Sequence, residues 1–587
     1  MKDLIANVIG DALEALRTDL PDLEPPAALT VERTRDPRHG DFASNVAMVL
    51  AKKAGMPPRQ LAERIVASLP DNPAIGDVQI AGPGFINFTL AKGQAQAVVF
   101  EIVDAGESYG CSDVGAGQKV LVEFVSANPT GPLHVGHGRG AAYGECVASL
   151  LKATGHDVSK EYYVNDAGRQ MDILAASVWL RYLQAMGEEL PFPTNGYRGD
   201  YIRDIAASLR DAHSDRFLRP AASVLADLPP DEPQGGNKDT YVDAVIANAK
   251  ALLGAEDYDI VHQCGLNAIL EDIRDDLDGF GVHMDRYFSE RSLTSDGTVD
   301  NALKRLADNG NTFETDGATW FRATKYGDDK DRVVVRANGQ RTYIASDIAY
   351  HLDKRLRGFD TLLDILGSDH HGYVARVRAG LMAMGQPGES LEVQLLQFVS
   401  LYRNGEKVAM TTRGGQFVTL RELREEVGND AARFFYVLRS NDQHLDFDLD
   451  LAKSKQNENP VYYVQYAHAR ICQMLAKLPE QQLEHDEQRA RDNVSLLTQD
   501  AELVLIKTLS RYPEQVAIAS RDRAPQTVVH YLRDLAADLH SFYNDSNCRV
   551  ITDNDALRDA RVGLIRATQQ VLRNGLGLLG VSAPEQM

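Results

Sequence analysis

A strand, a long helix and a second strand in succession constrain the fold of this 587-residue chain more than any other feature. The apolar run at 120–125 predicts a buried strand, residues 131–154 predict a helix that Gly155 ends, and 161–164 predict the next strand. Strands joined by one helix lie parallel, with a right-handed crossover. This part of the chain therefore predicts an α/β domain built on a parallel sheet.

The region before this pattern, residues 1–115, predicts a small α+β domain. Apolar residues at helical spacing predict a helix that the prolines at 21–26 end, and a second helix is expected at 43–54. Short alternating runs at 78–80 and 85–90, separated by a Gly-Pro-Gly turn, predict strands.

The rest of the chain divides in two. Residues 116–455 contain the strand–helix alternation, which returns at expected strands 332–336, 342–344 and 361–366, and a Pro-, Gly- and Asp-rich stretch predicts inserted segments at about 190–330. Residues 456–587 are almost wholly helical in pattern. The predicted fold is multidomain α/β: a small α+β N-terminal domain, a Rossmann-like parallel-sheet domain with insertions, and an all-α C-terminal bundle.

The charge balance limits the partners of this chain. With 84 acidic and 62 basic residues its formal charge is −22, which argues against indiscriminate nucleic-acid binding but allows a partner held by local basic patches. No apolar run approaches the ~20 residues of a membrane helix, and the first helix carries Asp11 and Glu14, unlike a secretory signal. The five cysteines are scattered without a Cys-x-x-Cys pair, so neither a disulfide scaffold nor a structural zinc site is expected. A cytoplasmic protein with no membrane partner is predicted.

The segment 126–140 follows the first central strand and opens a helix, which makes it a candidate anion site. A helix start offers unpaired backbone N–H groups and partial positive charge, and Gly136 allows a nucleotide to approach the backbone closely. His134 and His137 are three residues apart, so on a first helical turn they share a face. Two imidazoles there can donate hydrogen bonds to charge that develops on a phosphate.

Two other interpretations of this segment stay open at this point. Gly136, Gly138 and Ala141 fit a relaxed dinucleotide fingerprint with Asp157 downstream, but residues 128–132 separate the strand from the first glycine, which argues against a dehydrogenase. Alternatively, the segment is a glycine-rich helix start with capping histidines and no chemistry.

His134-Val-Gly-His137 resembles the first signature of the class I aminoacyl-tRNA synthetases, and the longer string around it is similar to the arginyl-tRNA synthetase version. The resemblance extends over essentially the whole chain, in the order of that family. The blocks that carry it are Arg38 to Asn45, Gly82 to Phe88, Tyr162 to Gly168, Asp347 with Gly367 to Tyr373, Gln465 to Arg470 and Asn574 to Met587.

This resemblance implies an arginine–tRNA ligase that activates L-arginine with ATP and transfers it to the terminal ribose of tRNA(Arg). It implies Mg²⁺ held mainly through ATP phosphates and water, no protein-bound metal, and a monomer. The extra N-terminal domain would recognise tRNA, and the C-terminal bundle would bind the anticodon. The residues implied at the ATP site are Pro132, Leu133, His134, Gly136, His137, Gly138, Met410, Thr411 and Thr412.

A guanidinium substrate requires a fixed carboxylate, because bidentate pairing with its planar fork gives both affinity and selectivity. Asp347 is the match to that acid in the family, with Tyr343 one helical turn or two strand steps away; the alternative for Asp347 is a helix N-cap. Asn128, and less strongly Ser126, match residues at the substrate's backbone end, although Asn128 also fits a simple Asn-Pro turn.

The adjacent histidines His370 and His371 invite a metal interpretation. Neighbouring side chains point to different faces of a helix or strand, so both cannot easily hold one ion. A place for His371 in the arginine pocket is expected instead.

The second class I signature departs from the usual Lys-Met-Ser-Lys-Ser. In Lys407-Val-Ala-Met-Thr-Thr-Arg-Gly-Gly415, Met410 matches the methionine but Thr412 occupies the place of the second lysine. Relatives that lack this lysine often carry another just before the first signature, where this chain has Gly131. Lys407 or Arg413 is expected to supply the missing cation for pyrophosphate; the alternative is a solvated basic turn.

Contacts with tRNA are expected in both terminal domains. Phe85 and Asn87 are candidates to stack on and read an exposed base, and a core phenylalanine is the alternative for Phe85. Aromatic and basic side chains on the C-terminal helices have the composition that splayed anticodon bases require, although several tyrosines must lie in the core. The candidates there are Tyr466, Arg470, Tyr543, Arg549 and Met587.

Two further functions compete with the ligase. An enzyme that uses the same histidine motif to adenylate a metabolite without tRNA would not need the helical C-terminal part. A non-catalytic RNA-binding paralogue would tolerate damage to the first signature, which is intact here, while its second signature is altered.

Overall fold

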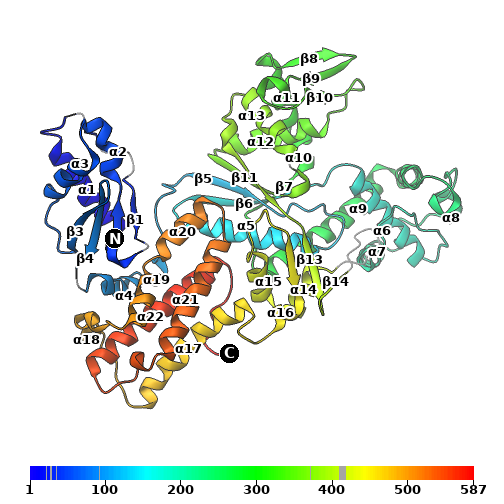
Figure 1. The fold of residues 1–587 in the computed structure, drawn as a ribbon. Helices are drawn as coiled ribbons and strands as arrows, with labels where there is room; N and C mark the ends of the chain where they lie inside the picture. The colour runs from blue at the N-terminus through cyan, green and yellow to red at the C-terminus, as the bar shows by residue number, and fades with distance from the viewer. Residues whose placement is uncertain are drawn as a thin grey trace. The chain divides into compact units, whose positions relative to one another are not determined.

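The computed structural model describes residues 1–587 except 22, 25, 27, 28, 35, 92, 371 and 409–417. Contacts within the described chain divide it into two compact units (Figure 1). The first unit contains Met1–Glu107, Ile471–Arg511 and Ala537–Val571; the second contains Ser108–Arg470, Tyr512–Ala536 and Leu572–Met587.

The first unit begins with a four-stranded antiparallel sheet in the order β1-β2-β4-β3, packed against three helices. Its elements are α1 (Lys2–Leu16), β1 (Val31–Arg33), β2 (Phe42–Ser44), α2 (Val46–Ala54), α3 (Pro58–Ala67), β3 (Ile75–Ala81) and β4 (Phe85–Leu90). Apolar residues of the helices cover Ile86 and Phe88 of β4. The helix expected at 43–54 starts only at Val46, because 42–44 pair as β2 with β4 and the chain must first leave the sheet.

The second unit is organised around a five-stranded sheet in the order β12-β11-β5-β6-β7, and every neighbouring pair is parallel. The predicted parallel-sheet domain is confirmed. Its strands are β5 (Lys119–Glu123), β6 (Asp157–Val164), β7 (Arg286–Ser289), β11 (Thr361–Gly367) and β12 (Leu391–Leu396), and its connecting helices include α5 (Val135–Ala153), α12 (Tyr343–Leu356) and α13 (Tyr373–Ala383).

The order of these strands identifies where a ligand would bind. The chain runs outward from β5 through β6 to β7, then returns to β11 on the other side of β5. The loops after β5 and β11 therefore leave the carboxyl edge of the sheet in opposite directions. In open parallel sheets, ligands bind outside the carboxyl ends of strands at such a switch point.

Of two strands expected in this unit, one is wrong and the other is confirmed but lies in a different sheet. The strand expected at 342–344 is the start of α12, with Thr342 at the N-cap, because apolar residues from Ala345 onward recur at helical spacing. The strand expected at 332–336 is β10 (Arg332–Val335), which joins an antiparallel sheet with β8 (Thr312–Thr315) and β9 (Ala318–Phe321) rather than the parallel sheet.

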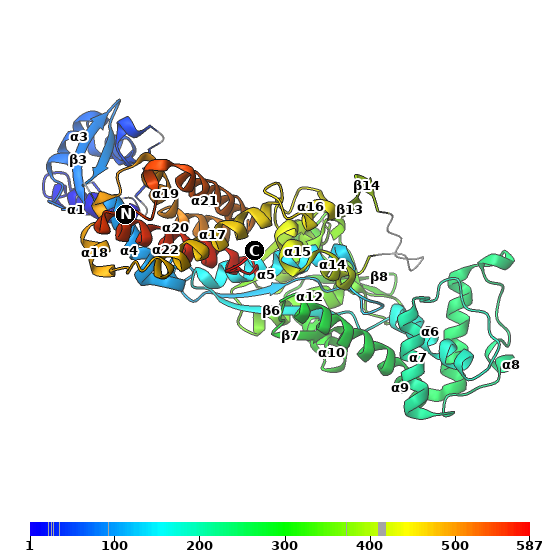
Figure 2. The ribbon, with the colours of Figure 1, turned by 90° about the horizontal axis from the view of Figure 1, so that it is seen from below.

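Of the residues predicted to be inserted segments, 190–330, most lie outside the parallel sheet, but β7 is one of its strands. Figures 1 and 2 show α6 to α9 as a helical lobe on the chain between β6 and β7, whereas β7 itself pairs with β6. The lobe consists of α6 (Arg169–Ala185), α7 (Asp200–His213), α8 (Ala221–Val224) and α9 (Lys238–Gly279).

The chain after β12 forms a small sheet and then helices. The sheet has the order β14-β13-β15. The elements are β13 (Val399–Arg403), β14 (Glu406–Lys407), α14 (Leu420–Val427), α15 (Asn429–Tyr436), β15 (Leu445–Asp448), α16 (Leu449–Lys453), α17 (Pro460–Glu480), α20 (Tyr512–Arg521), α21 (Gln526–Asn544) and α22 (Asp555–Leu578). The C-terminal part is helical, as predicted. In the described residues, no helix combines the length and hydropathy that crossing a membrane would need.

Candidate active site

The histidines of the first signature form the cap of α5. The Nδ1 atom of His134, the N-cap residue, accepts the Gly136 N–H at 3.0 Å, and the Nδ1 atom of His137 accepts the His134 N–H at 3.2 Å. Their rings stack with centroids 3.7 Å apart. The interpretation of capping histidines is thus right about local structure, and His134 lies just before the first helical turn rather than on it.

This capping fixes the chemistry of both rings. An Nδ1 atom that accepts a hydrogen bond carries no proton in the neutral ring, so the proton is on Nε2. Burial lowers the pKa of His137 to about 3, and burial likewise lowers the pKa of His134. Both rings are therefore neutral at physiological pH, and each carries its proton on Nε2, which makes that atom a hydrogen-bond donor.

The other residues expected at the ATP site differ in how they face solvent. Gly136 is exposed, and a Cβ atom there would lie 2.9 Å from Cε1 of His134. Leu133 and Gly138 are buried, and a Cβ atom at Gly138 would lie 2.6 Å from the Tyr436 hydroxyl oxygen. Pro132 is half-buried. Gly136 therefore leaves room beside the histidines, whereas Gly138 permits close packing of α5 against α15.

The chain that follows the second signature is bound to the first. The Val135 N–H donates to the Val418 carbonyl at 3.2 Å, and the Leu420 N–H donates to the Leu133 carbonyl at 2.8 Å. Lys407 is exposed on β14. Of the expected residues, Met410, Thr411, Thr412 and Arg413 lie outside the described residues.

The loop after β5 has a strained backbone at the expected Ser126. Val125 and Ser126 have φ angles of 69° and 39°, in a backbone region that residues other than glycine rarely occupy. The Ser126 hydroxyl donates to Oε1 of Glu123 at 3.0 Å and accepts the Tyr163 N–H at 3.1 Å. Asn128 accepts a hydrogen bond from Asn165 at 3.0 Å. The loop is therefore held to the carboxyl ends of β5 and β6.

Asp347 lies in the second turn of α12, so the alternative of an N-cap role is wrong. Among the described residues its carboxylate makes no hydrogen bond or ion pair. Burial raises the pKa of Asp347 to about 6, although His351, Arg376 and His370 act in the opposite direction. Tyr343, one turn earlier, is 73% exposed. His371 lies outside the described residues.

Two further carboxylates near Asp347 were not predicted from the sequence. Burial, together with Asp347 and Asp166, raises the pKa of Glu290 to about 7. Glu290 begins α10 (Glu290–Ser295) directly after β7, and Asp166 follows β6 and accepts the Arg291 N–H at 2.9 Å. A position directly after a parallel strand could have identified these two carboxylates from the sequence, but the sequence pattern placed β7 within an inserted segment.

Asp347, Glu290 and Asp166 lie together at the carboxyl edge of the sheet.

In the first unit, the candidates Phe85 and Asn87 share the face of β4 opposite the apolar core. Phe85 is 40% exposed, so the alternative of a core phenylalanine is wrong, whereas Asn87 is only 7% exposed. Tyr543 is half-buried and Arg549 is exposed.

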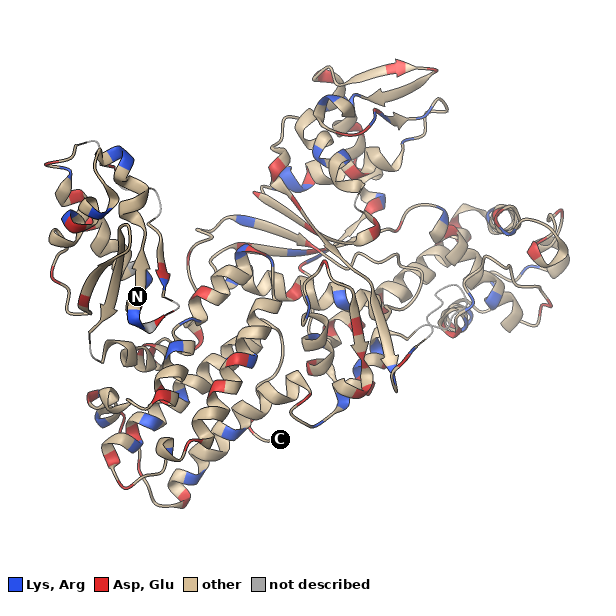
Figure 3. Ribbon diagram, in the orientation of Figure 1, with Lys and Arg blue, Asp and Glu red and all other residues tan. Residues whose placement is uncertain are grey.

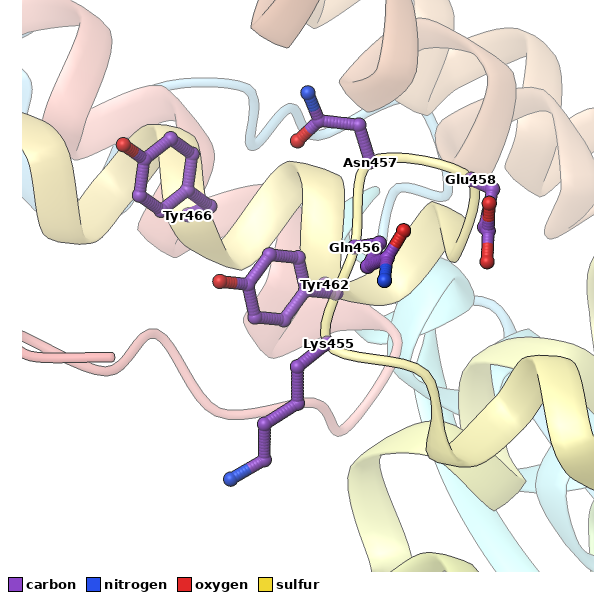
Figure 4. A pocket seen from close by; sticks show the side chains of 6 residues that line it. All are labelled: Lys455, Gln456, Asn457, Glu458, Tyr462 and Tyr466. Atoms are coloured by element: carbon purple, nitrogen blue, oxygen red, sulfur yellow. The ribbon is translucent and has the colours of Figure 1, made fainter.

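In the second unit, Tyr466 stacks on Tyr462 one turn away, with ring centroids 6.0 Å apart. The two rings lie on one side of α17 and line a pocket of about 470 Å³ (Figure 4). Its other lining residues are Lys455, Gln456, Asn457 and Glu458. Arg470 is half-buried and Met587 is 47% exposed. In Figure 3, basic and acidic segments are interspersed along the chain.

Within the part of the chain that is described, no three His, Cys, Asp or Glu side chains are grouped to hold a metal ion. His370 lies 3.2 Å from the Asp369 carboxylate instead.

A parallel sheet with capping histidines at its switch point corresponds to the catalytic domain of a class I aminoacyl-tRNA synthetase. The family described as "tRNA synthetases class I (R), catalytic domain" matches residues 99–191 and 263–456. "Arginyl tRNA synthetase N terminal domain" matches 2–90, and "DALR anticodon binding domain" matches 464–587.

Full-length relatives define the family further. The chain is 57% identical over 589 residues to the arginine–tRNA ligase of Thioalkalivibrio sulfidiphilus and 52% identical over 590 residues to that of Legionella pneumophila, with 100% of each chain covered. The arginyl-tRNA synthetase structure from Thermus thermophilus shares the fold, with a TM-score of 0.72, 23% identity and 100% of both chains covered. The chain belongs to the arginyl-tRNA synthetase family. The predicted resemblance is confirmed, and the dehydrogenase and metabolite-adenylating alternatives are excluded.

Proposed function

We propose that the arginine–tRNA ligase reaction of this protein takes place at the carboxyl edge of the parallel sheet. ATP and L-arginine form arginyl-adenylate and pyrophosphate, and the arginyl group then passes to the 3′-terminal ribose of tRNA(Arg). The observation that supports this site is the carboxylate of Asp347, which is half-buried and has no partner among the described residues. It lies beside Glu290, at the edge of the sheet where the capping histidines also lie.

Asp347 and Glu290 are proposed to bind the guanidinium. A planar fork pairs with a carboxylate through two parallel hydrogen bonds. Its positive charge would offset both the burial and the repulsion by Asp347 and Asp166 that raise the pKa of Glu290. The exposed ring of Tyr343 and the imidazole of His371 are proposed to line the same pocket. Ser126 and Asn128, on the loop after β5, would hold the α-amino and carboxylate end.

The histidines are proposed to act in adenylate formation. An arginine carboxylate oxygen attacks the α-phosphorus of ATP, and the bond to the leaving pyrophosphate breaks as the new bond forms. The Nε2–H groups of His134 and His137 donate to the phosphate oxygens on which charge develops. Gly136 leaves space for the nucleotide, with Pro132, Leu133 and Gly138 shaping the loop around it.

A positive charge near the departing pyrophosphate would come from Lys407 or Arg413. Met410, Thr411 and Thr412 belong to the same segment, and its far end is held to the first signature at Val418. Mg²⁺ would neutralise phosphate charge while bound mainly to phosphate oxygens and water.

tRNA is proposed to contact both terminal parts of the chain. Phe85 and Asn87 would meet an exposed base, and the proposed anticodon contacts are Tyr466, Arg470, Tyr543, Arg549 and Met587. The proposed domains are 1–115 for tRNA recognition, 116–455 for catalysis and 456–587 for the anticodon. We further propose a cytoplasmic monomer.

The test is ATP–pyrophosphate exchange and tRNA charging by the purified chain, with L-citrulline as the neutral isostere of arginine. Exchange that requires both arginine and tRNA, with no response to citrulline, is expected. Exchange with another metabolite in the absence of tRNA would contradict the proposal, and a chain that binds tRNA without charging it would be the non-catalytic paralogue.

A further inference from the structure

The face of α12 that packs on the parallel sheet is polar where a core helix is normally apolar. Asp347, Tyr350, His351 and Lys354 follow the spacing of one helix face. Lys354 is 0% and His351 1% exposed. Burying these groups costs free energy unless each finds a partner.

The sheet beneath this helix presents a row of three carboxylates. Asp364 of β11 pairs in register with Glu123 of β5, and Glu123 pairs in register with Glu161 of β6. All three residues are buried. Like charges on adjacent strands are unfavourable, so this row depends on the cations above it.

Lys354 lies at the centre of these contacts. Its Nζ donates to Oε2 of Glu123 at 2.5 Å and to Oδ1 of Asp364 at 2.9 Å. Burial alone would lower the pKa of Lys354, yet the carboxylates of Asp364 and Glu123 hold it above its usual value, so the lysine stays charged. Arg357 forms two hydrogen bonds with Glu161, at 2.7 and 2.9 Å.

The same contacts reach both ends of the proposed arginine site. At one end, Oε1 of Glu123 accepts the Ser126 hydroxyl at 3.0 Å. At the other, Nε2 of His351 donates to Asp364 at 2.7 Å and its Nδ1 donates to the main-chain carbonyl of Asp347 at 2.8 Å. Both ring nitrogens of His351 therefore face oxygen acceptors.

A continuous path therefore runs beneath the substrate site. We call it the Lys354 network: Ser126, Glu123, Lys354, Asp364, His351 and Asp347. Buried ion pairs stabilise folds weakly compared with apolar packing, and their best-attested role is to fix one arrangement among several. Here the arrangement that is fixed is the position of α12 over β5 and β11.

We infer that the Lys354 network sets the distance between the guanidinium-binding carboxylate of Asp347 and the Ser126 loop, and so determines the length of side chain that the enzyme accepts. The inference rests on the proposed roles of Asp347 and Ser126. Glu123, Lys354, Asp364 and His351 touch no substrate; they are positioning residues. A loosened network should weaken binding of arginine more than binding of ATP.

The test compares Lys354→Met with Lys160→Met. Lys160 forms a buried ion pair with Glu145 at 2.8 Å, and it precedes Glu161 on β6, so its side chain points to the opposite face of the sheet. Lys160 has no link to Ser126 or Asp347 through the network. Each variant removes one buried, ion-paired lysine from the parallel-sheet domain, Lys354 from α12 and Lys160 from β6, which makes the pair a matched control for loss of stability.

In Lys354→Met we expect the KM for arginine to rise about tenfold or more, the size expected when a charged hydrogen bond is lost, with the KM for ATP within about twofold. The preference for L-arginine over L-homoarginine, one methylene longer, should fall several-fold, whereas Lys160→Met should keep it. Equal arginine KM and equal length preference in the two variants would overturn the inference.

A second, milder variant tests the inference even if Lys354→Met does not fold. Glu123→Gln keeps the shape of the side chain and removes its charge, so the same shift in arginine KM and length preference is expected without loss of fold. A double-mutant cycle of Ser126→Ala with His351→Gln, which do not touch, should give non-additive changes in arginine KM. If the changes in arginine KM of Ser126→Ala and His351→Gln are strictly additive, and Glu123→Gln keeps the preference for arginine over homoarginine, the inference is also overturned.

The inference and the proposed function fail differently. If Asp347→Asn leaves the KM for arginine unchanged, the proposed guanidinium site is wrong, and the inference falls with it. If Asp347→Asn raises that KM while Lys354→Met and Glu123→Gln do not, only the inference about the network is wrong.

Discussion

The imidazole rings of His134 and His137 stack at the start of α5, with their centroids 3.7 Å apart. The stacking follows from the capping box, in which each Nδ1 accepts a backbone N–H. The backbone at the proposed anion-binding start of α5 thus also orients the two imidazole rings and fixes their tautomers. The two hydrogen bonds that cap α5 therefore also place the Nε2–H donors that are proposed to act in catalysis.

Replacing His137 by Asn should lower the maximal rate of pyrophosphate exchange by about 10²–10³, the cost of losing one donor to developing charge (~3–4 kcal/mol). The KM for arginine should change little, because His137 is proposed to meet phosphate. His283→Asn is the control, since His283 is exposed and pairs with Asp278. An unchanged maximal rate in His137→Asn would contradict the proposed role.

A methyl group at Gly136 should damage ATP use without unfolding the protein. In Gly136→Ala the new Cβ would lie 2.9 Å from Cε1 of His134, so the ring must move. We expect kcat/KM for ATP to fall about tenfold or more, because misplaced donors stabilise the transition state poorly. Gly577→Ala, where a Cβ meets nothing within 4 Å, is the control. Normal kinetics in Gly136→Ala would show that the orientation of His134 is unimportant.

Arginine affinity should depend on pH through Asp347. Burial raises the pKa of Asp347 to about 6, and only the ionised carboxylate can pair with a guanidinium. As the pH falls, the KM for arginine should rise first as Glu290, with a pKa of about 7, takes up its proton, and then about tenfold per pH unit below 6 as Asp347 does. The measurement is kcat/KM for arginine against pH. Asp347→Asn should lose the tenfold rise per pH unit below 6, and a profile that is flat in the unmodified enzyme would contradict the assignment.

The buried carboxylate of Asp347 should lower the free energy of unfolding of the enzyme without substrate. The pKa of Asp347 is about 6 in the folded protein against 3.8 as its ordinary value, so the folded state binds the proton more tightly. Stability is then lost as the pH rises from 3.8 through 6. Asp347→Asn should therefore raise the free energy of unfolding at neutral pH by on the order of 3 kcal/mol. Urea unfolding at several pH values measures this. The advantage should shrink as the pH falls below 6; a destabilised variant at neutral pH would contradict the argument.

Removing the exposed ring of Phe85 should weaken tRNA binding. Base–aromatic stacking contributes about 1–3 kcal/mol, so Phe85→Ala should raise the KM for tRNA by roughly 5- to 100-fold. The charging rate at saturating tRNA and the KM for arginine should stay the same. Val49→Ala removes another exposed apolar side chain, 57% exposed on α2, and should have no effect. Equal KM values for tRNA in the two variants would exclude Phe85 as a contact.

Sequence patterns were sufficient for the parallel sheet because strand and helix periodicities are local. They failed at 342–344, because these residues form only the N-cap and first turn of α12, and the apolar residues at helical spacing begin at Ala345. Glu290 was missed because an acidic residue after a short strand becomes visible only when β7 is known to join the sheet. The burial of Lys354 could not be predicted either, since a lysine in a helix is usually exposed and its carboxylate partners are far apart in sequence.

The most direct test of the central claim is charging of tRNA with labelled L-arginine by the unmodified enzyme and by Asp347→Asn, with arginine titrated at neutral pH. Charging by the unmodified enzyme is expected, with a KM for arginine about 100-fold higher in the variant (~3 kcal/mol) and no charging of citrulline by the unmodified enzyme. If the variant retains the original KM for arginine, the guanidinium site lies elsewhere. If the unmodified enzyme does not charge tRNA at all, the assignment of ligase activity to this chain is wrong.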